Sequence, residues 1–365
     1  MNYMNWLKKM LAVIVVAVLA LSVAGCSKEE PVENDPNKPY AGTTITVFNW
    51  YDYIDEEVLD IFYEETGIKV EYANFTTCEE MYTKLVASPS SYDVIIPSDY
   101  IIERLINEGM LFELDTASMP NYAGLMEWIK TPGYDPEGKY SVAYMWGTVG
   151  ILYNTRKTDG YVDSWADLFD TKYAGDVFMM DSMRDTIGVG LKYTGHSMNS
   201  TDQTELYEAR DVLISQKQSG VVKAYLVDET KDMMVGGEAA MALVWSGDAL
   251  YAIEKNGDLE YCVPVEGSNI WVDGMCIPAG SENKEAAMIF IDFMCRPDIA
   301  YKNQQYIYYS TPVQAVVDTM YTNEERANLT LNPTQDIIDR CEFFTDISAY
   351  NALYEEVWMG IKQAQ

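Results

Sequence analysis

Short runs of β-branched and aromatic residues alternate with helical patterns from Thr44 onward, and this alternation restricts the fold more than any other feature of the sequence. Between the first two strand runs, Val58 and Phe62 recur at helical spacing until Gly67 ends the pattern. The alternation predicts strands at 44–48, 68–72 and 92–97 and helices at 56–65, 77–85 and 101–108. Strand, helix and strand in this order predict a parallel sheet of the α/β class.

A second series of the same kind follows further along the chain. It predicts strands at 177–180, 241–245 and 271–277 and helices near 186–193, 204–216, 284–295 and 347–362. These elements are too many for one compact sheet, and the chain is long enough for two cores. We therefore expect two α/β lobes, although periodicity alone does not say where the chain crosses between them.

The beginning of the chain has the pattern of a secretory leader. Two lysines precede an uncharged apolar run, Met10–Val23, and the sequence Val-Ala-Gly-Cys ends at Cys26. The run is shorter than the roughly 18 to 20 residues that a membrane-spanning helix needs, so it predicts a signal peptide over residues 1–25. Small residues directly before Cys26 predict its lipidation; the alternative is an ordinary signal peptide whose cysteine is incidental. Residues 26–41, rich in proline and charge, predict a flexible tether behind the lipidated cysteine.

The charge of the chain excludes one class of partner. Its 57 Asp and Glu residues outnumber 25 Lys and Arg residues, for a net charge of −32. Such a field repels nucleic acid and attracts cations, so we expect no nucleic-acid partner. Most of these acids are expected to be solvated surface residues, and charge alone therefore names no ligand.

Candidate catalytic and metal-ligating residues are few. Five cysteines besides Cys26 lack Cys-x-x-Cys spacing, and His196 is the single histidine, so we expect neither a metal nor a cofactor. The sequence lacks the motifs of serine hydrolases, zinc proteases and phosphate-binding loops, and in its polar loop His196 is expected to be an exposed imidazole. We predict that the protein is not an enzyme, but a glycosidase that uses two carboxylates stays open, as does disulfide pairing.

Four short segments place Trp or Tyr beside an acid at the predicted carboxyl end of a strand, where α/β sheets bind ligands. They are Asn49–Tyr53, Pro97–Tyr100, Trp245–Asp248 and Trp271–Asp273. A core aromatic residue needs no acid within three positions, whereas a site for an organic cation needs both. Methylenes pack on flat rings, ammonium groups bind carboxylates and ring faces, and each cation–π contact contributes about 0.5 to 2 kcal/mol. The segments therefore predict a site for a small polycation, most simply a polyamine.

At these segments and others the chain resembles the spermidine/putrescine-binding proteins of polyamine ABC transporters, from about Thr44 to the C-terminus. The other segments are Glu65–Val70, Met81–Leu85, Tyr92–Val94, Glu108–Met110, Ser164–Leu168, Arg296–Asp298 and Tyr354–Glu356. The resemblance implies the two-lobed α/β fold of type II periplasmic binding proteins, with the ligand in a cleft between the lobes. On this pattern, lobe 1 comprises 42–149 and 272–318, and lobe 2 comprises 150–271 and 319–365.

The same resemblance implies which residues line the cleft. They are Trp50, Asp52, Tyr53, Ser98, Tyr100, Asp185, Trp245, Asp248, Trp271, Asp273 and Tyr309. Two positions depart from the pattern: Ser182 stands where spermidine binders have an aspartate, and Phe344 stands where they have a glutamine. Asp248 lies where putrescine-selective relatives have an acid. Putrescine, spermidine or both are therefore expected as ligands, and the choice between them stays open.

The resemblance implies that the protein is the extracytoplasmic substrate-binding component of an ABC importer. We expect a monomer, anchored to the lipid bilayer through Cys26, that closes on a polyamine without chemistry. It would deliver the polyamine to a membrane permease driven by an ATPase. The alternatives are a binder of another cationic or zwitterionic solute, a glycosidase, or an adhesion lipoprotein without a small ligand.

Overall fold

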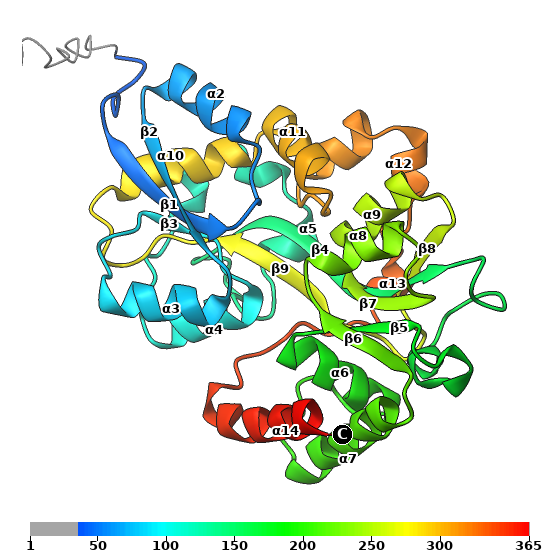
Figure 1. Ribbon diagram of the computed structural model, residues 1–365. Helices are drawn as coiled ribbons and strands as arrows, with labels where there is room; N and C mark the ends of the chain where they lie inside the picture. Colours follow the sequence, from blue (N-terminus) through cyan, green and yellow to red (C-terminus); the bar gives the residue numbers. More distant parts are fainter. Residues whose placement is uncertain (1–35, 365) are drawn as a thin grey trace, which may run out of the picture.

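The computed structural model of the protein describes residues 36–364, which form two α/β lobes joined by antiparallel strands (Figure 1). The predicted signal peptide, residues 1–25, and Cys26 lie outside the described residues. Between residues 36 and 364, no helix is long and apolar enough to cross a membrane.

The first lobe contains a parallel sheet with the strand order β2-β1-β3. Helices α2 and α10 cover one side of this sheet, and α3 and α4 cover the other (Figure 1). The bounds are β1 Thr44–Trp50, β2 Lys69–Phe75, β3 Val94–Ile95, α2 Glu56–Thr66, α3 Cys78–Ala87, α4 Asp99–Asn107 and α10 Lys284–Met294. The predicted order of strands and helices in this lobe is confirmed.

Local sequence explains where these elements begin and end. The side chains of Asp55 and Thr77 each accept a hydrogen bond from a backbone amide in the first turn of α2 and α3. Gly67 ends α2 in the left-handed conformation, with φ 72°. The strand predicted over 92–97 is shorter than expected, because Pro97 has no amide hydrogen with which to continue the sheet.

The second lobe contains a mixed sheet with the strand order β6-β5-β7-β4-β8. Its two faces have separate cores: Val177 and Met179 of β5 pack on one side, and Phe178 packs on the other. Helices α6, α7 and α14 cover the first face, and α8 and α9 cover the second (Figure 1). The bounds are β5 Val177–Met180, β6 Val222–Leu226, β7 Met241–Trp245, β8 Leu259–Cys262, α6 Met183–Tyr193, α7 Gln203–Gln218, α8 Glu229–Val235, α9 Ser246–Lys255 and α14 Asn351–Gln363.

Strand β4, Val142–Asn154, connects the lobes and was not predicted. Its first half pairs with β9, Ile270–Met275, and its second half pairs with β7 and β8. All 13 residues of β4 are buried. A strand that is buried on both sides has no alternation of apolar and polar residues, and its two glycines interrupt the apolar pattern further.

The hydrophobic cores show that each lobe is assembled from separate stretches of the chain. The first core takes buried residues from 45–146 and again from 270–331, whereas the second takes them from 149–271 and 347–361. Tyr321 and Leu331 pack in the first core, although the sequence-based division placed 319–365 in lobe 2. The exact lobe boundaries stay a prediction.

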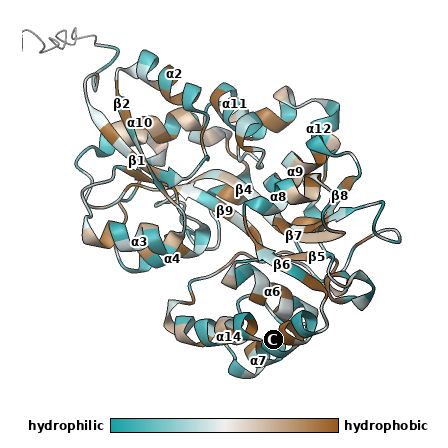
Figure 2. Ribbon diagram, viewed as in Figure 1, coloured by the Kyte–Doolittle hydropathy of each residue, from teal (hydrophilic) through white to brown (hydrophobic). Residues whose placement is uncertain are grey.

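Hydropathy differs between the central strands and the outer surfaces of the helices that cover them. In Figure 2 the central strands are mostly hydrophobic, while the helices show hydrophilic residues on their outer surfaces. The remaining helices are α5 Glu127–Lys130, α11 Pro297–Ile307, α12 Asn323–Ala327 and α13 Gln335–Ile338. Of these, α11 packs beside α10 and α2 and supports the region that leads to Tyr309.

Candidate ligand-binding site

Asp273 is the most strongly organised carboxylate of the predicted site. Ser98 Oγ donates a hydrogen bond of 2.6 Å to one of its oxygens, and Tyr53 Oη donates one of 2.8 Å to the other. The residue is only 5% exposed, and burial raises the pKa of its carboxyl to about 6 against the opposing effect of these two hydrogen bonds. A buried carboxylate is therefore held in place by two neutral hydroxyl groups.

The position of Asp273 in its strand differs from the prediction. Trp271 and Asp273 were expected at the carboxyl end of a strand, but both lie within β9. The side chain of Asp273 still reaches the first lobe, because Ser98 pairs with Asp273 as an isolated antiparallel bridge and Gly274 N donates to Pro97 O. The β9 strand therefore joins the edge of the first sheet directly.

A second row of hydrogen bonds fixes Tyr53. The Tyr144 hydroxyl donates to Tyr53 O at 2.5 Å and accepts from Asn303 Nδ2 at 2.8 Å. Tyr144 lies on β4 and Asn303 on α11, so two distant stretches of chain position the residue that holds Asp273. Burial and the nearby Asp273 raise the pKa of Tyr53 well above its usual range, so its hydroxyl keeps its proton and remains a donor.

Three aromatic rings form a continuous wall beside Asp273. The Tyr309 ring lies edge-on to Trp271, with 4.9 Å between centroids, and edge-on to Tyr53, with 5.9 Å between centroids. Two glycines make room for these rings: a Cβ on Gly247 would lie 2.4 Å from the Tyr309 ring, and a Cβ on Gly147 would lie 2.6 Å from Trp271. Any larger residue at either glycine would displace the wall.

Asp248 is the second carboxylate near this wall. It follows the end of β7, as the sequence predicted, and lies in the first turn of α9, a helix that was not predicted. Burial raises the pKa of Asp248 to about 6; Lys231 opposes the increase, and Asp228 and Asp232 add to it. Burial, Asp248 and Asp273 all raise the pKa of Tyr309 well above its usual range. The Tyr309 ring is thus within electrostatic reach of both carboxylates.

Asp185 belongs to a separate cluster on α6. It accepts a hydrogen bond of 2.5 Å from Ser182 Oγ, and burial raises the pKa of its carboxyl. The neighbouring guanidinium of Arg184 lies 4.2 Å from the ring centroid of Phe344 and 5.7 Å from that of Tyr100. Arg184 thus reaches from the second lobe to a residue of the first, a contact that the sequence did not indicate.

The other predicted residues make contacts of their own. Asp52 is exposed, has a left-handed backbone with φ 52°, and accepts a hydrogen bond of 2.6 Å from Tyr306 Oη. Trp50 packs against Phe75 with 4.7 Å between ring centroids, and its buried Nε1 has no hydrogen-bond partner. The remaining two make less specific contacts: the Tyr100 hydroxyl donates to Glu79 at 3.3 Å, and Trp245, partly buried, precedes α9. Ligand contact by these four residues, as by the other seven predicted site residues, stays a prediction.

One side chain close to the site was missed and one prediction was wrong. Lys231 of α8 lies beside Asp248, and nothing in the sequence signals this contact between separate elements.

His196 was expected to be exposed, but it is only 23% exposed: its Nε2 lies 2.9 Å from Glu208 and its Nδ1 lies 3.5 Å from Glu205. The loop folds back on α7, so two glutamates partly cover the imidazole.

The described residues show neither a disulfide nor a metal site. The five cysteines of the described region are free thiols: Cys78, Cys262, Cys276, Cys295 and Cys341. Within residues 36–364, no group of three or more His, Cys, Asp or Glu side chains is placed to hold a metal ion. The groups that the structure brings together around Asp273 are hydroxyl groups and aromatic rings.

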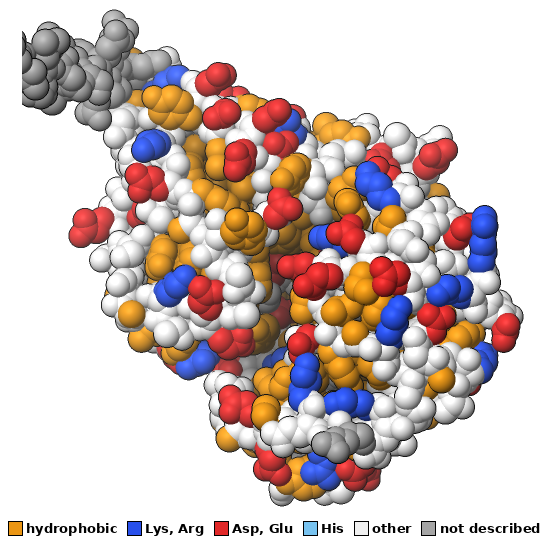
Figure 3. Space-filling model, viewed as in Figure 1, with side chains coloured by type: hydrophobic (Ala, Val, Ile, Leu, Met, Phe, Trp, Pro, Cys, Tyr) orange, Lys and Arg blue, Asp and Glu red, His pale blue; other side chains and the backbone are white. Residues whose placement is uncertain are grey.

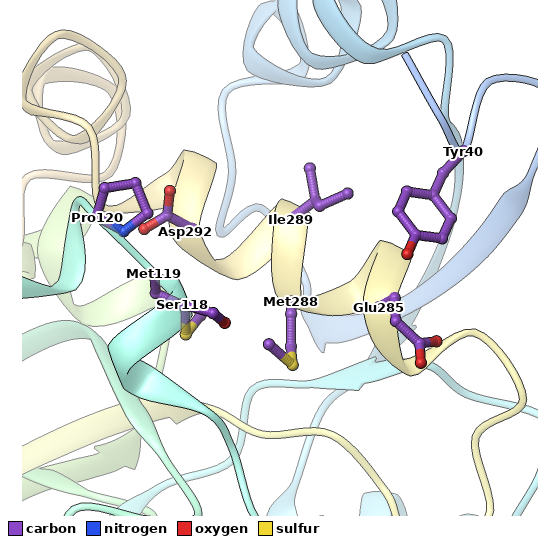
Figure 4. A pocket seen from close by; sticks show the side chains of 8 residues that line it. All are labelled: Tyr40, Ser118, Met119, Pro120, Glu285, Met288, Ile289 and Asp292. Atoms are coloured by element: carbon purple, nitrogen blue, oxygen red, sulfur yellow. The ribbon is translucent and has the colours of Figure 1, made fainter. Parts of the chain in front are cut away.

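The surface is hollowed between the two lobes. Figure 3 shows a groove there, with Asp and Glu side chains gathered along its edges and hydrophobic side chains between them. A separate hollow of 420 Å³ lies on the first lobe, beside α10 (Figure 4). Asp292 in that hollow already accepts hydrogen bonds from the backbone and side chain of Asn121. The hollow is lined by a single aromatic ring, Tyr40, and by none of the predicted site residues, so it is not the candidate site.

Comparison with known proteins gives consistent results along most of the chain. A family model described as bacterial extracellular solute-binding protein matches residues 57–329. The spermidine/putrescine-binding periplasmic protein of Escherichia coli (strain K12) is 32% identical over 321 residues, which cover 87% of this chain and 91% of that protein.

Two solved structures are similar in both sequence and fold. A putative spermidine/putrescine ABC transporter from Listeria monocytogenes is 34% identical with a TM-score of 0.82, and the match covers 88% of this chain and 100% of that one. A spermidine/putrescine ABC transporter substrate-binding protein from Streptococcus pneumoniae is 33% identical with a TM-score of 0.80, over 88% and 99% of the chains. This likeness confirms the predicted two-lobed α/β fold.

Proposed function

Since this chain belongs to the bacterial extracellular solute-binding proteins, we propose that it binds a polyamine, putrescine or spermidine, as the substrate-binding component of an ABC importer. The family assignment agrees with the resemblance found in the sequence. Solute-binding proteins capture and release their ligands, so we propose no chemistry at the paired carboxylates. The relatives named above support the ligand class, and the geometry of the site supports it independently.

One observation carries the proposal: Asp273 is a buried carboxylate whose two bonded partners, Ser98 and Tyr53, are neutral. A rise of its pKa from 3.8 to about 6 means that keeping it ionised in the empty protein costs on the order of 3 kcal/mol. An alkylammonium group would remove this cost and would lie beside the rings of Trp271 and Tyr309. A polyamine supplies that ammonium together with methylenes that can pack along the aromatic wall.

A titration of tryptophan fluorescence tests the proposal, because Trp271 lies within the wall. Putrescine and spermidine should each change the emission, with saturation at one ligand per protein. Arginine and glycine betaine are the comparison ligands, since they represent other cationic and zwitterionic solutes. A response to either of these and none to the polyamines would replace the polyamine with that class of solute. An adhesion lipoprotein without a small ligand would respond to none of them.

The groove between the lobes supports a mechanism of capture by closure. The open form would admit the polycation, and rotation of the lobes about β4 and β9 would bury it. Closure is favoured only by contacts that improve in the closed form, such as those between the ligand and side chains from both lobes. The closed form would then dock on a membrane permease coupled to an ATPase.

Anchoring through lipid is the second part of the proposal. Cys26→Ala should release the protein from membranes or block its maturation, because Cys26 ends the only lipidation pattern in the sequence. Metabolic labelling with a fatty acid measures the effect, with Cys78→Ala as the matched control since Cys78 is buried in the folded lobe. Undiminished label on the Cys26→Ala protein would refute lipidation at this residue.

The preference for a shorter or a longer polyamine is expected to depend on residue 182. Ser182 donates its hydroxyl to Asp185, so the cluster has one carboxylate where spermidine binders would have two. Ser182→Asp adds a carboxylate, and we expect the ratio of affinities to shift toward spermidine by about tenfold, the effect of roughly 1.4 kcal/mol. Competition between putrescine and spermidine measures the ratio, and Ser182→Asn, similar in size but neutral, is the control. A ratio that is the same in all three proteins would show that position 182 does not choose the ligand.

A further inference from the structure

Lys231 is a cation of the protein itself that lies beside one of the two site carboxylates. Its Nζ is 3.5 Å from Asp248 Oδ1, and the two side chains are 31% and 16% exposed. The same ammonium lies 5.6 Å from the centroid of the Tyr251 ring. Asp248 therefore already has an ammonium partner, which is the group that a polyamine would bring to it.

The contact between Lys231 and Asp248 is loose. Charge-assisted hydrogen bonds are commonly about 2.7 to 2.9 Å long, whereas this one is 3.5 Å. Two other carboxylates, Asp228 and Asp232, also stabilise the charged form of Lys231. Asp228 precedes α8 and Asp232 lies on it, both are exposed, and Lys231 is on the same helix. The ammonium can therefore leave Asp248 without losing every anionic partner.

Asp273 and Asp248 thus differ in a way that bears on ligand choice. Asp273 has only neutral donors, Ser98 and Tyr53, so a ligand ammonium meets no competitor there. At Asp248 the ligand must compete with Lys231. Lys231 and the ligand both compete for Asp248. The ligand ammonium at Asp248 therefore gains less binding free energy than the ammonium at Asp273.

We propose that Lys231 is a specificity-determining residue: its ammonium neutralises Asp248 in the empty protein and must be displaced toward Asp228 or Asp232 when a ligand with two ammonium groups binds. This inference rests on the proposed polyamine function. Lys231 thereby lowers affinity for dications while leaving affinity for monocations, which need only Asp273, unaffected. The protein tunes its preference by the number of ligand charges as well as by ligand length.

The test compares ligands that differ by one charge. Lys231→Met should bind putrescine about tenfold more tightly than wild type, since a loosely held ion pair no longer competes, and should bind 1-butylamine unchanged. Measurements by calorimetry and NMR at about pH 8 keep the carboxylates ionised and the amines protonated. Lys231→Arg should behave as wild type. Lys255→Met is the matched control, because Lys255 lies 5.5 Å from the same Tyr251 ring but pairs with Glu254.

Unchanged or weakened putrescine binding by folded Lys231→Met would overturn the inference, as would an equal gain for 1-butylamine. Failure of the proposed function looks different, because wild type would then bind neither amine. A readout without ligand covers that case: the NMR-measured pKa of Asp248 in the empty protein should rise when Lys231 is replaced by Met or Gln. An unaltered value in both variants would show that Lys231 does not neutralise Asp248.

Discussion

Asp273→Asn is expected to weaken putrescine binding by about 30-fold to about 4,000-fold, the range that corresponds to losing roughly 2 to 5 kcal/mol when one partner of a buried charge pair is removed. Asn keeps the size and shape of the side chain, and the Ser98 and Tyr53 hydroxyls can rotate to pair with its amide. The loss therefore reports the charge of Asp273 and not a collapse of the site. Isothermal titration calorimetry measures it directly.

The same substitution should not lower the stability of the empty protein. Because burial raises the pKa of Asp273, its ionised form destabilises the empty fold above about pH 6, and the neutral amide should leave the melting temperature equal or higher there. Asp60→Asn is the matched control, since Asp60 is exposed on α2. Wild-type affinity in the Asp273→Asn protein would remove Asp273 from the binding site.

Affinity for putrescine is expected to fall about a hundredfold between roughly pH 7 and pH 5, because two carboxylates must lose protons to bind two ammonium groups. The pKa values of Asp273 and Asp248 are each about 6 in the empty protein. Each group then contributes a factor of about ten over this interval, since protons compete with the ligand below its pKa. Among the charged groups near them, Lys231 favours ionised Asp248, whereas Asp228 and Asp232 oppose it.

Asp273 and Asp248 should affect the stability of the empty protein in the opposite direction. As the pH rises, they increase affinity for putrescine but lower the stability of the fold. A carboxyl whose folded pKa is raised destabilises the fold as the pH increases from about 4 to about 6, and the effect is constant above that. Other carboxylates such as Glu80, whose pKa is lowered, act the other way, so the quantity to follow is the melting temperature of wild type minus that of Asp273→Asn. Affinity that is constant from about pH 5 to pH 8 would contradict the assignment of these two carboxylates.

The fold could be predicted best where only one face of an element is buried. Helix α2 shows its apolar stripe through Val58 and Phe62, and its caps at Asp55 and Gly67 mark both ends. Strand β4 shows no alternation because it is buried on both sides, and two glycines also interrupt its apolar run. Strand β5 is buried on both sides too, but its uninterrupted apolar run could still be predicted. The lobes were therefore predictable, but the strand that connects them was not.

The candidate site was predictable in its composition and not in its pairings. The aromatic and acidic segments named Trp271, Asp273 and Asp248, all of which lie at or near the aromatic wall around Tyr309. Lys231 was missed because it lies on α8 while Asp248 lies on α9, and the contact depends on how two helices pack. Sequence periodicity describes single elements, so contacts between separate elements stay hidden from it.

The way β4 and β9 tie the lobes together also limits how the chain can fold. In these strands Val142 pairs with Met275, and the first core is completed only by residues as late as Leu331. A ribosome or a translocation pore that has released only the first half of the chain has therefore released neither lobe in full. Such long-range pairing slows folding and keeps apolar surface exposed for longer. Neither lobe is expected to survive as a separate fragment, and the two should unfold together as one cooperative unit.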